Sequence, residues 1–231
     1  MSEPPTRKHT EVMRALLPLS GRSVVEIGCG GGALLRFMAH LGASPAIGID
    51  PNPDVLRRAD TVDRQGDERY LVALGEALPF GDASVDAVVC ANTLHHIPSE
   101  AMVPALADAA RVVKPGGQIY VTEPIAEGAY FELVRPIEDE TEIRRIAYEA
   151  LRTAAALPQL TLAQEFVYLA PIHVADFAAF RQRMIDVDRS RRDKVLGLEA
   201  ELRAGFEETA VARDGVFWFD QPTRLVLLTR H

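Results

Sequence analysis

The chain has 231 residues, of which 48% are hydrophobic and 25% are charged, and its formal net charge is −8. This composition is that of an ordinary globular protein, and the length predicts one domain. The negative balance disfavours a duplex nucleic-acid surface, which uses a clustered basic stripe, so we expect no nucleic-acid partner. Cys29 and Cys90 are too few and too far apart for a disulfide framework or a metal cluster, so no metal site is predicted.

The N-terminal stretch MSEPPTRKHTE lacks the apolar core of a secretory signal. No apolar run elsewhere in the sequence reaches the length that spans a membrane. The sequence therefore predicts a cytoplasmic protein without membrane insertion, in agreement with its sparse cysteines.

The first half of the chain alternates short apolar segments with helical ones. The apolar segments are branched and nearly continuous, which is typical of strands buried on both faces of a parallel sheet. Strands are predicted at 24–27, 46–49, 70–73, 85–91 and 119–122, and helices at 7–17, 33–41, 54–60 and 100–113. The repetition of strand, helix and strand predicts a parallel sheet with right-handed crossovers.

The pattern changes after Pro124. Helices are predicted at 138–156, 174–187 and 193–208, and strands at 161–169, 216–219 and 224–229. Asp-Gln-Pro separates the last two strands and is a turn signal, so these strands predict a closing antiparallel pair. We interpret 1–231 as a single domain, in which 1–124 binds a cofactor and 125–231 supplies a helical cover, the substrate pocket and the closing strands.

The most informative stretch is VVEIGCGGGALL, residues 24–35, in which a strand, a glycine turn and a helix follow one another. Glycines permit positive φ and let a ligand reach the main chain, and the helix N-terminus offers free N–H groups. The segment GCGGGA also satisfies the dinucleotide pattern G-x-G-x-x-G/A. The glycine turn alone is therefore compatible with either a nicotinamide dinucleotide or S-adenosylmethionine as the cofactor.

Two carboxylates accompany the glycine turn. Asp50 ends the second predicted strand, where a carboxylate can take both ribose hydroxyls of either cofactor. The other reading of Asp50 is that it caps the helix that follows. Glu26 stands two positions before the first glycine, and we expect it to bind an ammonium group or to hold the N–H groups of the loop.

Two further sequence blocks distinguish between the two candidate cofactors. GEALPFGDASVDAVVCANTLHHI spans 75–97, and RVVKPGGQIYVTEP spans 111–124. Together with the glycine turn and Asp50, these blocks make the region of about 20–125 resemble a class I S-adenosylmethionine-dependent methyltransferase. The similarity is greatest to the small-molecule branch that includes quinone-biosynthesis methyltransferases.

The resemblance implies a fold and a reaction. The fold is α/β, with a doubly wound, mostly parallel seven-stranded sheet of Rossmann-like type, a C-terminal antiparallel strand pair and a helical cover. The reaction is transfer of the methyl group of S-adenosylmethionine to a small organic acceptor by in-line displacement, which leaves S-adenosylhomocysteine as the product.

The resemblance also implies cofactor contacts at the methionine part, the ribose, the adenine edge and the end of the fourth strand. The residues are Glu26, Gly28, Cys29, Gly30, Asp50, Pro51, Gly75, Glu76, Ala77, Asn92, Thr93 and Leu94. One position departs from the family, because Leu74 stands where many relatives carry an acidic residue that contacts the adenine amino group. We therefore expect backbone groups to bind the adenine.

His95 and His96 follow the fourth predicted strand, at the edge of the sheet where open α/β folds bind ligands. A histidine there can take a proton from a hydroxyl or amine acceptor. The alternative is that one packs under the cofactor and the other hydrogen-bonds a loop. For the acceptor pocket, the aromatic residues Tyr130, Phe131 and Tyr148 are the predicted lining.

Two other functions stay open at this stage. An NAD-dependent oxidoreductase on a Rossmann sheet agrees with the glycines and Asp50, although the EALPF and KPGG blocks argue against it. A cofactor-binding protein that does not transfer a methyl group agrees with Leu74. The helical cover and an edge hairpin each offer a face through which a homodimer can form.

Overall fold

The computed structural model describes residues 4–187 and 189–231, so residues 1–3 of the N-terminal stretch and Asp188 lie outside the described residues. The chain divides into two compact units. The large unit contains His9–Glu123, Ile143–Phe166 and Arg224–His231. The small unit contains residues 4–8, Pro124–Glu142 and Val167–Thr223.

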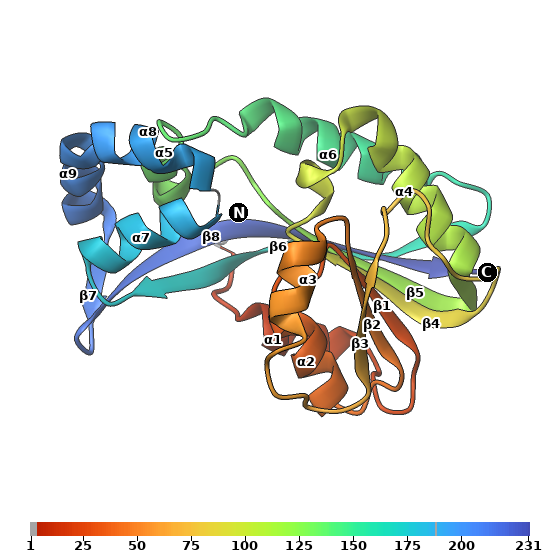
Figure 1. Ribbon diagram of the computed structural model, residues 1–231. Coiled ribbons are helices and arrows are strands. Elements are labelled where there is room, and N and C mark those ends of the chain that lie inside the picture. The colour runs from red at the N-terminus through yellow and green to blue at the C-terminus, as the bar shows by residue number, and fades with distance from the viewer. Residues whose placement is uncertain (1–3, 188) are drawn as a thin grey trace. The chain divides into compact units, whose positions relative to one another are not determined.

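The large unit is built on a sheet whose parallel strands pair in the order β3-β2-β1-β4-β5 (Figure 1). These strands are β1 Val24–Ile27, β2 Ala46–Asp50, β3 Glu68–Val72, β4 Val85–Ala91 and β5 Val113–Pro124. The chain order reverses between β1 and β4, and ligands bind at such a reversal, outside the carboxyl ends of the strands. The glycine turn follows β1, and the two histidines follow β4.

The sheet continues from β5 through two long strands that run on into the small unit. These are β8 Val216–Arg230 and β6 Leu160–Val174, next to β5 in the order β5-β8-β6. Seven strands therefore lie on the continuous path, and an eighth, β7 Val211–Arg213, pairs with β8. The predicted α/β class with a mostly parallel seven-stranded sheet is confirmed.

Helices of the large unit pack against this sheet. They are α1 His9–Leu16, α2 Ala33–His40, α3 Pro53–Ala59, α4 Ser99–Val112 and most of α6 Thr141–Ala155. Apolar side chains of α4 and α6 share one core with the strands, among them Met102, Leu106, Ala147 and Leu151. The helices α2 and α3 instead contact β2 and β3, and Figure 1 shows them away from α4 and α6.

The small unit is mainly helical. Its helices are α5 Ala129–Val134, α7 Phe177–Val187, α8 Arg192–Gly197 and α9 Glu199–Thr209, and Figure 1 shows them gathered beside β7 and the adjoining part of β8. Phenylalanine rings from α7, α9 and β8 form the centre of its core. The single helix predicted at 193–208 is wrong, because the chain forms α8 and α9 with a break after Gly197, a residue that favours helix ends.

The predicted division of the C-terminal strands is also wrong. The segments 216–219 and 224–229 form the single strand β8 rather than two strands joined by a turn. Pro222 lacks an N–H group, but its carbonyl accepts from Ile125 N–H at 2.8 Å. The Gln221 side chain in turn donates to the Ile125 carbonyl at 2.9 Å. These bonds let a proline remain within a strand, which the local turn signal cannot indicate.

The antiparallel strand pair exists, but its members differ from the predicted ones. β7 pairs antiparallel with the start of β8, with Val211 opposite Trp218 and Arg213 opposite Val216. Asp214 and Gly215 join the two strands, and both have positive φ, as a tight hairpin turn requires. In the part of the chain that the structure covers, no helix is long and apolar enough to cross a membrane.

Candidate active site

Protein side chains fix both ends of the glycine loop that joins β1 to α2. Gly28 and Gly32 have φ of +67° and +72°, a region that side chains rarely adopt. A Cβ on Gly28 would lie 2.1 Å from Thr93 Cγ2, and one on Gly32 would lie 2.4 Å from Tyr70 Oη. At these two positions packing within the protein is therefore sufficient to exclude a larger residue.

The middle of the same loop is open. No described atom lies within 4 Å of a Cβ built on Gly30 or Gly31. Gly30 has a φ of +50°, but Gly31 does not have a positive φ, so neither conformation nor packing requires a glycine at that position. Gly31 is exposed. Its bare main chain at the start of α2 is a surface that a ligand can approach closely.

Glu26 lies in β1 beneath this open stretch and is only 4% exposed. Its Oε2 atom is buried and has no hydrogen-bond partner among the described residues. Burial raises the pKa of Glu26 to about 8, against the lowering effects of the Arg36 charge and a hydrogen bond from the Leu35 backbone. A buried carboxyl with a free oxygen is the partner that an ammonium group needs.

Asp50 ends β2 and its carboxylate faces the glycine loop. One oxygen accepts from Gly30 N–H at 3.1 Å, and the other accepts from Asn52 N–H at 2.9 Å. The cap of α3 is Asn52, whose side chain accepts from Asp54 N–H at 2.9 Å. The capping alternative for Asp50 is therefore wrong. A carboxylate offers about four acceptor positions, so these two bonds leave room for hydroxyl donors.

A turn at residues 75–77 passes over the end of β1. A Cβ on Gly75 would lie 3.1 Å from Ile27 Cγ2, and Ala77 N–H donates to the Leu74 carbonyl at 3.2 Å. Gly75 is buried and Glu76 is partly buried. Leu74 is 51% exposed, so the position that departs from the family presents an apolar side chain to solvent. Pro51, which follows Asp50 in the chain, is exposed.

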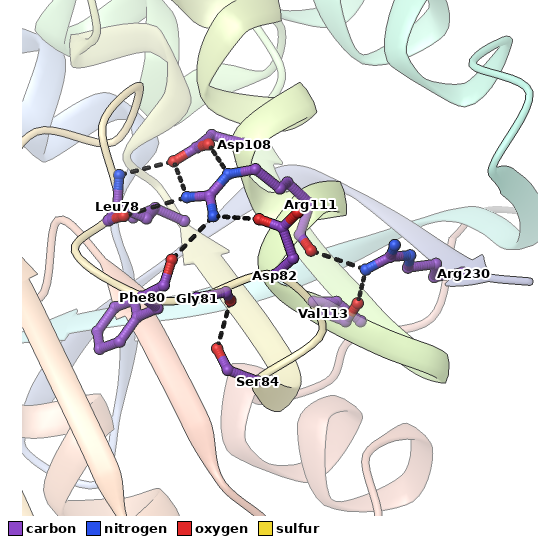
Figure 2. A network of polar contacts seen from close by, with 9 residues as sticks. All are labelled: Leu78, Phe80, Gly81, Asp82, Ser84, Asp108, Arg111, Val113 and Arg230. Carbon is purple, nitrogen blue, oxygen red and sulfur yellow. Dashed lines mark hydrogen bonds and ion pairs between the residues drawn. The ribbon is translucent and has the colours of Figure 1, made fainter.

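Arg111, near the end of α4, holds the segment that follows this turn (Figure 2). Its guanidinium donates to the Phe80 carbonyl at 2.8 Å and to the Leu78 carbonyl at 3.2 Å. It also forms ion pairs with Asp108 at 2.6 Å and Asp82 at 2.8 Å. Asp108 in turn accepts from Leu78 N–H at 2.6 Å. The loop between β3 and β4 is thereby anchored to α4.

His95 is buried at 7% exposure, and its Nδ1 atom contacts the carboxylate of Glu123. The other oxygen of Glu123 accepts from Thr93 N–H at 2.9 Å and from Leu94 N–H at 2.8 Å. Glu123 therefore organises the whole segment that follows β4. His96 is exposed, and its ring centroid lies 4.0 Å from that of His95.

The end of β4 also contacts the glycine loop. Asn92 has a φ of +52° and donates its N–H to the Thr122 carbonyl at 2.7 Å. The Thr93 hydroxyl donates to the Ala91 carbonyl at 3.1 Å and lies 3.4 Å from the Gly28 carbonyl. The large unit thus brings the glycine loop, both carboxylates, the 75–77 turn and the segment after β4 together at one edge of the sheet.

The predicted acceptor residues are divided between the two units. Tyr130 and Phe131 are 8% and 2% exposed within the small unit, and the Tyr130 ring packs 5.3 Å from that of Phe219. Tyr148 belongs to the large unit and donates its hydroxyl to Glu165 at 2.9 Å. The guanidinium of Arg224 lies 3.8 Å from the Tyr148 ring centroid. Each of the three is thus engaged in packing or polar contacts of its own unit.

Glu123 is a site residue that the sequence reasoning did not single out. The available signal is its position at the carboxyl end of a buried strand, which it shares with Asp50. Tyr70 was also missed, because nothing local indicates that a side chain of β3 reaches the glycine loop.

Comparison with known proteins gives relatives along much of the chain. A family model described as "Methyltransferase domain" matches residues 25–121. The chain is 34% identical over 167 residues to a ubiquinone biosynthesis O-methyltransferase of Paracidovorax citrulli, covering 60% of this chain and 68% of that protein. A protein of the same name from Cupriavidus pinatubonensis is 41% identical over 108 residues, which cover 45% of this chain and 42% of that protein.

A solved structure shares the fold over nearly the whole chain. It is a SAM-dependent methyltransferase from Methanosarcina mazei, with a TM-score of 0.61 and 14% sequence identity. The alignment covers 97% of this chain and 99% of that chain. At this identity the likeness shows a common fold and leaves the chemistry to the residues of the site.

Proposed function

Because the chain belongs to the class I S-adenosylmethionine-dependent methyltransferases, we propose that it binds this cofactor at the glycine loop of the large unit and methylates a small organic acceptor. The relatives reported above are O-methyltransferases by name, which supports an oxygen atom as the nucleophile. Their names give no support to a nicotinamide-dependent oxidoreductase or to a protein without activity.

The observation that carries the proposal is the buried carboxyl of Glu26 beneath an open glycine surface. S-adenosylmethionine supplies a methyl group on a sulfonium, which is already activated for displacement. Glu26 would accept a hydrogen bond from the cofactor's amino group, and the main chain at Gly30 and Gly31 would lie against its amino-acid tail. Asp50 would take the ribose hydroxyls, and backbone groups of the 75–77 turn would meet the adenine.

The protein's task in such a reaction is to position the acceptor and exclude water. An acceptor hydroxyl must also lose a proton, and His95 is the proposed proton acceptor. With Nδ1 donating to Glu123, the lone pair of the ring lies on Nε2, which is then the nitrogen that can take the proton. His96 remains the second candidate for the same role.

Three further predictions belong to this proposal. The chain acts as one methyltransferase domain, Tyr130, Phe131 and Tyr148 line the acceptor pocket, and the enzyme is a cytoplasmic homodimer without a nucleic-acid partner. Replacing a pocket residue should raise the KM of the acceptor and leave cofactor affinity unchanged. Light scattering of the purified chain tests the dimer.

Calorimetric titration with S-adenosylhomocysteine, with NAD run in parallel, tests the cofactor assignment. We expect micromolar binding of the first and none of the second, and Asp50→Ala should weaken binding about tenfold through lost charge-assisted hydrogen bonds. Asp54→Ala is the matched control, because Asp54 is an exposed carboxylate on α3 that pairs with Arg57. Binding of NAD, or an equal effect of both variants, would contradict the assignment.

Transfer itself is tested with S-adenosylmethionine labelled in its methyl group and a panel of small phenols. We expect label in at least one phenol and a loss of rate with His95→Gln at unchanged cofactor affinity. Cofactor binding without transfer to any member of the panel would favour the non-catalytic alternative.

A further inference from the structure

Two side chains outside the predicted site hold the glycine loop from one side. Arg36 of α2 donates through Nη2 to the Gly31 carbonyl at 2.9 Å and through Nη1 to Tyr70 Oη at 3.1 Å. Tyr70 comes from β3, and its ring occupies the space that a side chain on Gly32 would need, with Cε1 2.7 Å from the built Cβ. The loop is thus in contact with a linked pair of side chains from two different elements.

The pair fixes a particular peptide bond. A peptide unit is planar, so holding the Gly31 carbonyl also sets the direction of the Gly32 N–H group. That N–H donates to the Cys29 carbonyl at 2.8 Å. The peptide between Gly31 and Gly32 is therefore held at both of its polar atoms, by Arg36 on one side and by the loop itself on the other.

Such support matters because consecutive glycines have an unusually large conformational freedom. Ordering them is unfavourable in entropy, and a loop left to itself samples many backbone conformations. Gly30 and Gly31 have no packing neighbour of their own at the Cβ position. A ligand that binds there would meet a preformed surface only if contacts from outside the loop hold it.

Arg36 also affects the carboxyl of Glu26, which lies beneath the glycine loop. Its charge lowers the pKa of Glu26, although burial is the larger effect and leaves that pKa raised. Other titratable groups that interact here are Cys29, through Glu26 and Asp50, Cys90, through Glu26, and Tyr70, through Arg36. A cation beside Glu26 favours the ionised carboxylate that an ammonium ligand requires.

We propose that Arg36 and Tyr70 are positioning residues that hold Gly31 and Gly32 in the conformation that binds the amino-acid tail of the cofactor, an inference that rests on the proposed function. They touch neither the ribose ligand Asp50 nor the 75–77 turn in any contact described above. Their effect should therefore fall on affinity for the tail and leave affinity for the adenosine part unchanged.

The test compares two ligands that differ only at the tail. S-adenosylhomocysteine carries it, and 5′-methylthioadenosine has the same adenosine and thioether without the amino acid. The full chain is titrated with both ligands as wild type, Tyr70→Phe and Arg36→Met. Arg58→Met is the control, because Arg58 is an exposed arginine on the neighbouring helix α3.

We expect Arg36→Met to raise the Kd of S-adenosylhomocysteine about tenfold, because it removes the bond to the Gly31 carbonyl directly. Tyr70→Phe should raise it about threefold, because it removes only the hydroxyl that accepts from Arg36. The Kd of 5′-methylthioadenosine should stay within about twofold for every variant. Tyr70→Phe keeps the ring against Gly32, so it tests the polar link with the packing preserved.

If both variants bound S-adenosylhomocysteine with unchanged affinity, this inference would be overturned and the proposed function would stand. An equal loss of affinity for both ligands would also overturn it, because that result indicates a general loosening of the large unit. Absence of S-adenosylhomocysteine binding to the wild-type chain would overturn the proposed function and this inference with it.

Discussion

Two buried glutamates on strands of the same sheet differ in how their carboxyls are satisfied. Glu26 at the end of β1 is 4% exposed, and Glu123 at the end of β5 is 6% exposed. Glu123 accepts from Thr93 and Leu94 and contacts His95. Glu26 has a buried oxygen without a hydrogen-bond partner in the described part of the chain.

The difference separates a carboxylate that the protein itself satisfies from one for which we propose a ligand as the partner. Leaving a buried polar group unpaired is unfavourable. The unpaired oxygen of Glu26 therefore needs an explanation that the fully paired carboxylate of Glu123 does not. At Glu123 the reason for burial lies in the chain itself. At Glu26 the described residues leave one buried oxygen unpaired, and the proposed binding of a cationic group would account for it.

Removing the satisfied carboxylate should have the largest effect. Glu123→Ala leaves two buried N–H groups and His95 without their acceptor, so we expect the free energy of unfolding to fall by about 4 kcal/mol. Urea denaturation at pH 7 measures the change. Glu127→Ala is the control, since Glu127 is exposed and should change stability by less than about 0.5 kcal/mol. If the free energy of unfolding fell by less than about 1 kcal/mol in Glu123→Ala, the contrast between Glu123 and Glu26 would be contradicted.

Glu26→Gln should change stability in the opposite direction. The pKa of Glu26 is raised from an ordinary 4.5 to about 8, so the folded state holds the proton more tightly and its stability falls as the pH rises from 4.5 through 8. Glutamine does not ionise, and we expect it to raise the free energy of unfolding by about 2 kcal/mol at pH 8. Affinity for S-adenosylhomocysteine should nevertheless fall at least about tenfold.

The matched control for this variant is Glu68→Gln. Glu68 is fully buried too, but its two oxygens accept from Gln65 N–H at 2.7 Å and Gly66 N–H at 2.8 Å. Its replacement should lower stability and leave cofactor affinity unchanged. If Glu26→Gln behaved like Glu68→Gln in both respects, Glu26 would be a structural carboxylate and the contrast would be lost.

A smaller effect is expected at a carboxylate near the surface. Although burial raises the pKa of Asp86, hydrogen bonds from Lys114 and Ser23 lower it to about 2 from an ordinary 3.8. The stabilisation it provides is therefore present above pH 3.8 and is lost as the pH falls through about 2. Because its side chain is 25% exposed, we expect Asp86→Asn to lower the free energy of unfolding at pH 7 by only about 1 kcal/mol.

Denaturation at pH 7 and at pH 2.5 checks this prediction, since the wild type and Asp86→Asn should be closer in stability at the lower pH. An unchanged difference between them would show that Asp86 does not contribute through its charge.

The sequence predicts the β1–β5 part of the fold well for a physical reason. Strands β1, β2 and β4 are short, apolar runs that are largely buried, so burial leaves a direct mark on the local pattern. The mostly exposed β3 is the exception, and it begins two residues before the predicted strand. The continuity of β8 was missed because the turn signal at Pro222 is local, whereas the bonds to Ile125 that keep the strand continuous are not. Glu123 and Tyr70 were missed for the same reason, since their partners are remote in the sequence.

The glycine loop has features that the local sequence indicates and others that depend on residues remote in the sequence. Its glycines predict a close approach to the backbone, which agrees with the open surface at Gly30 and Gly31. At Gly28 and Gly32 the approaching groups are side chains of Thr93 and Tyr70. A glycine in a sequence thus indicates that something comes close, and the structure decides whether the neighbour is the protein or a ligand.

The most direct test of the role of Glu26 is the number of protons released when S-adenosylhomocysteine binds. Calorimetry at pH 7 in buffers of different ionisation enthalpy measures it. At this pH a carboxyl with a pKa of about 8 is mostly protonated and must lose its proton to pair with an ammonium group. The account predicts release of nearly one proton with S-adenosylhomocysteine and none with 5′-methylthioadenosine or in Glu26→Gln. Binding of S-adenosylhomocysteine without proton release would contradict it.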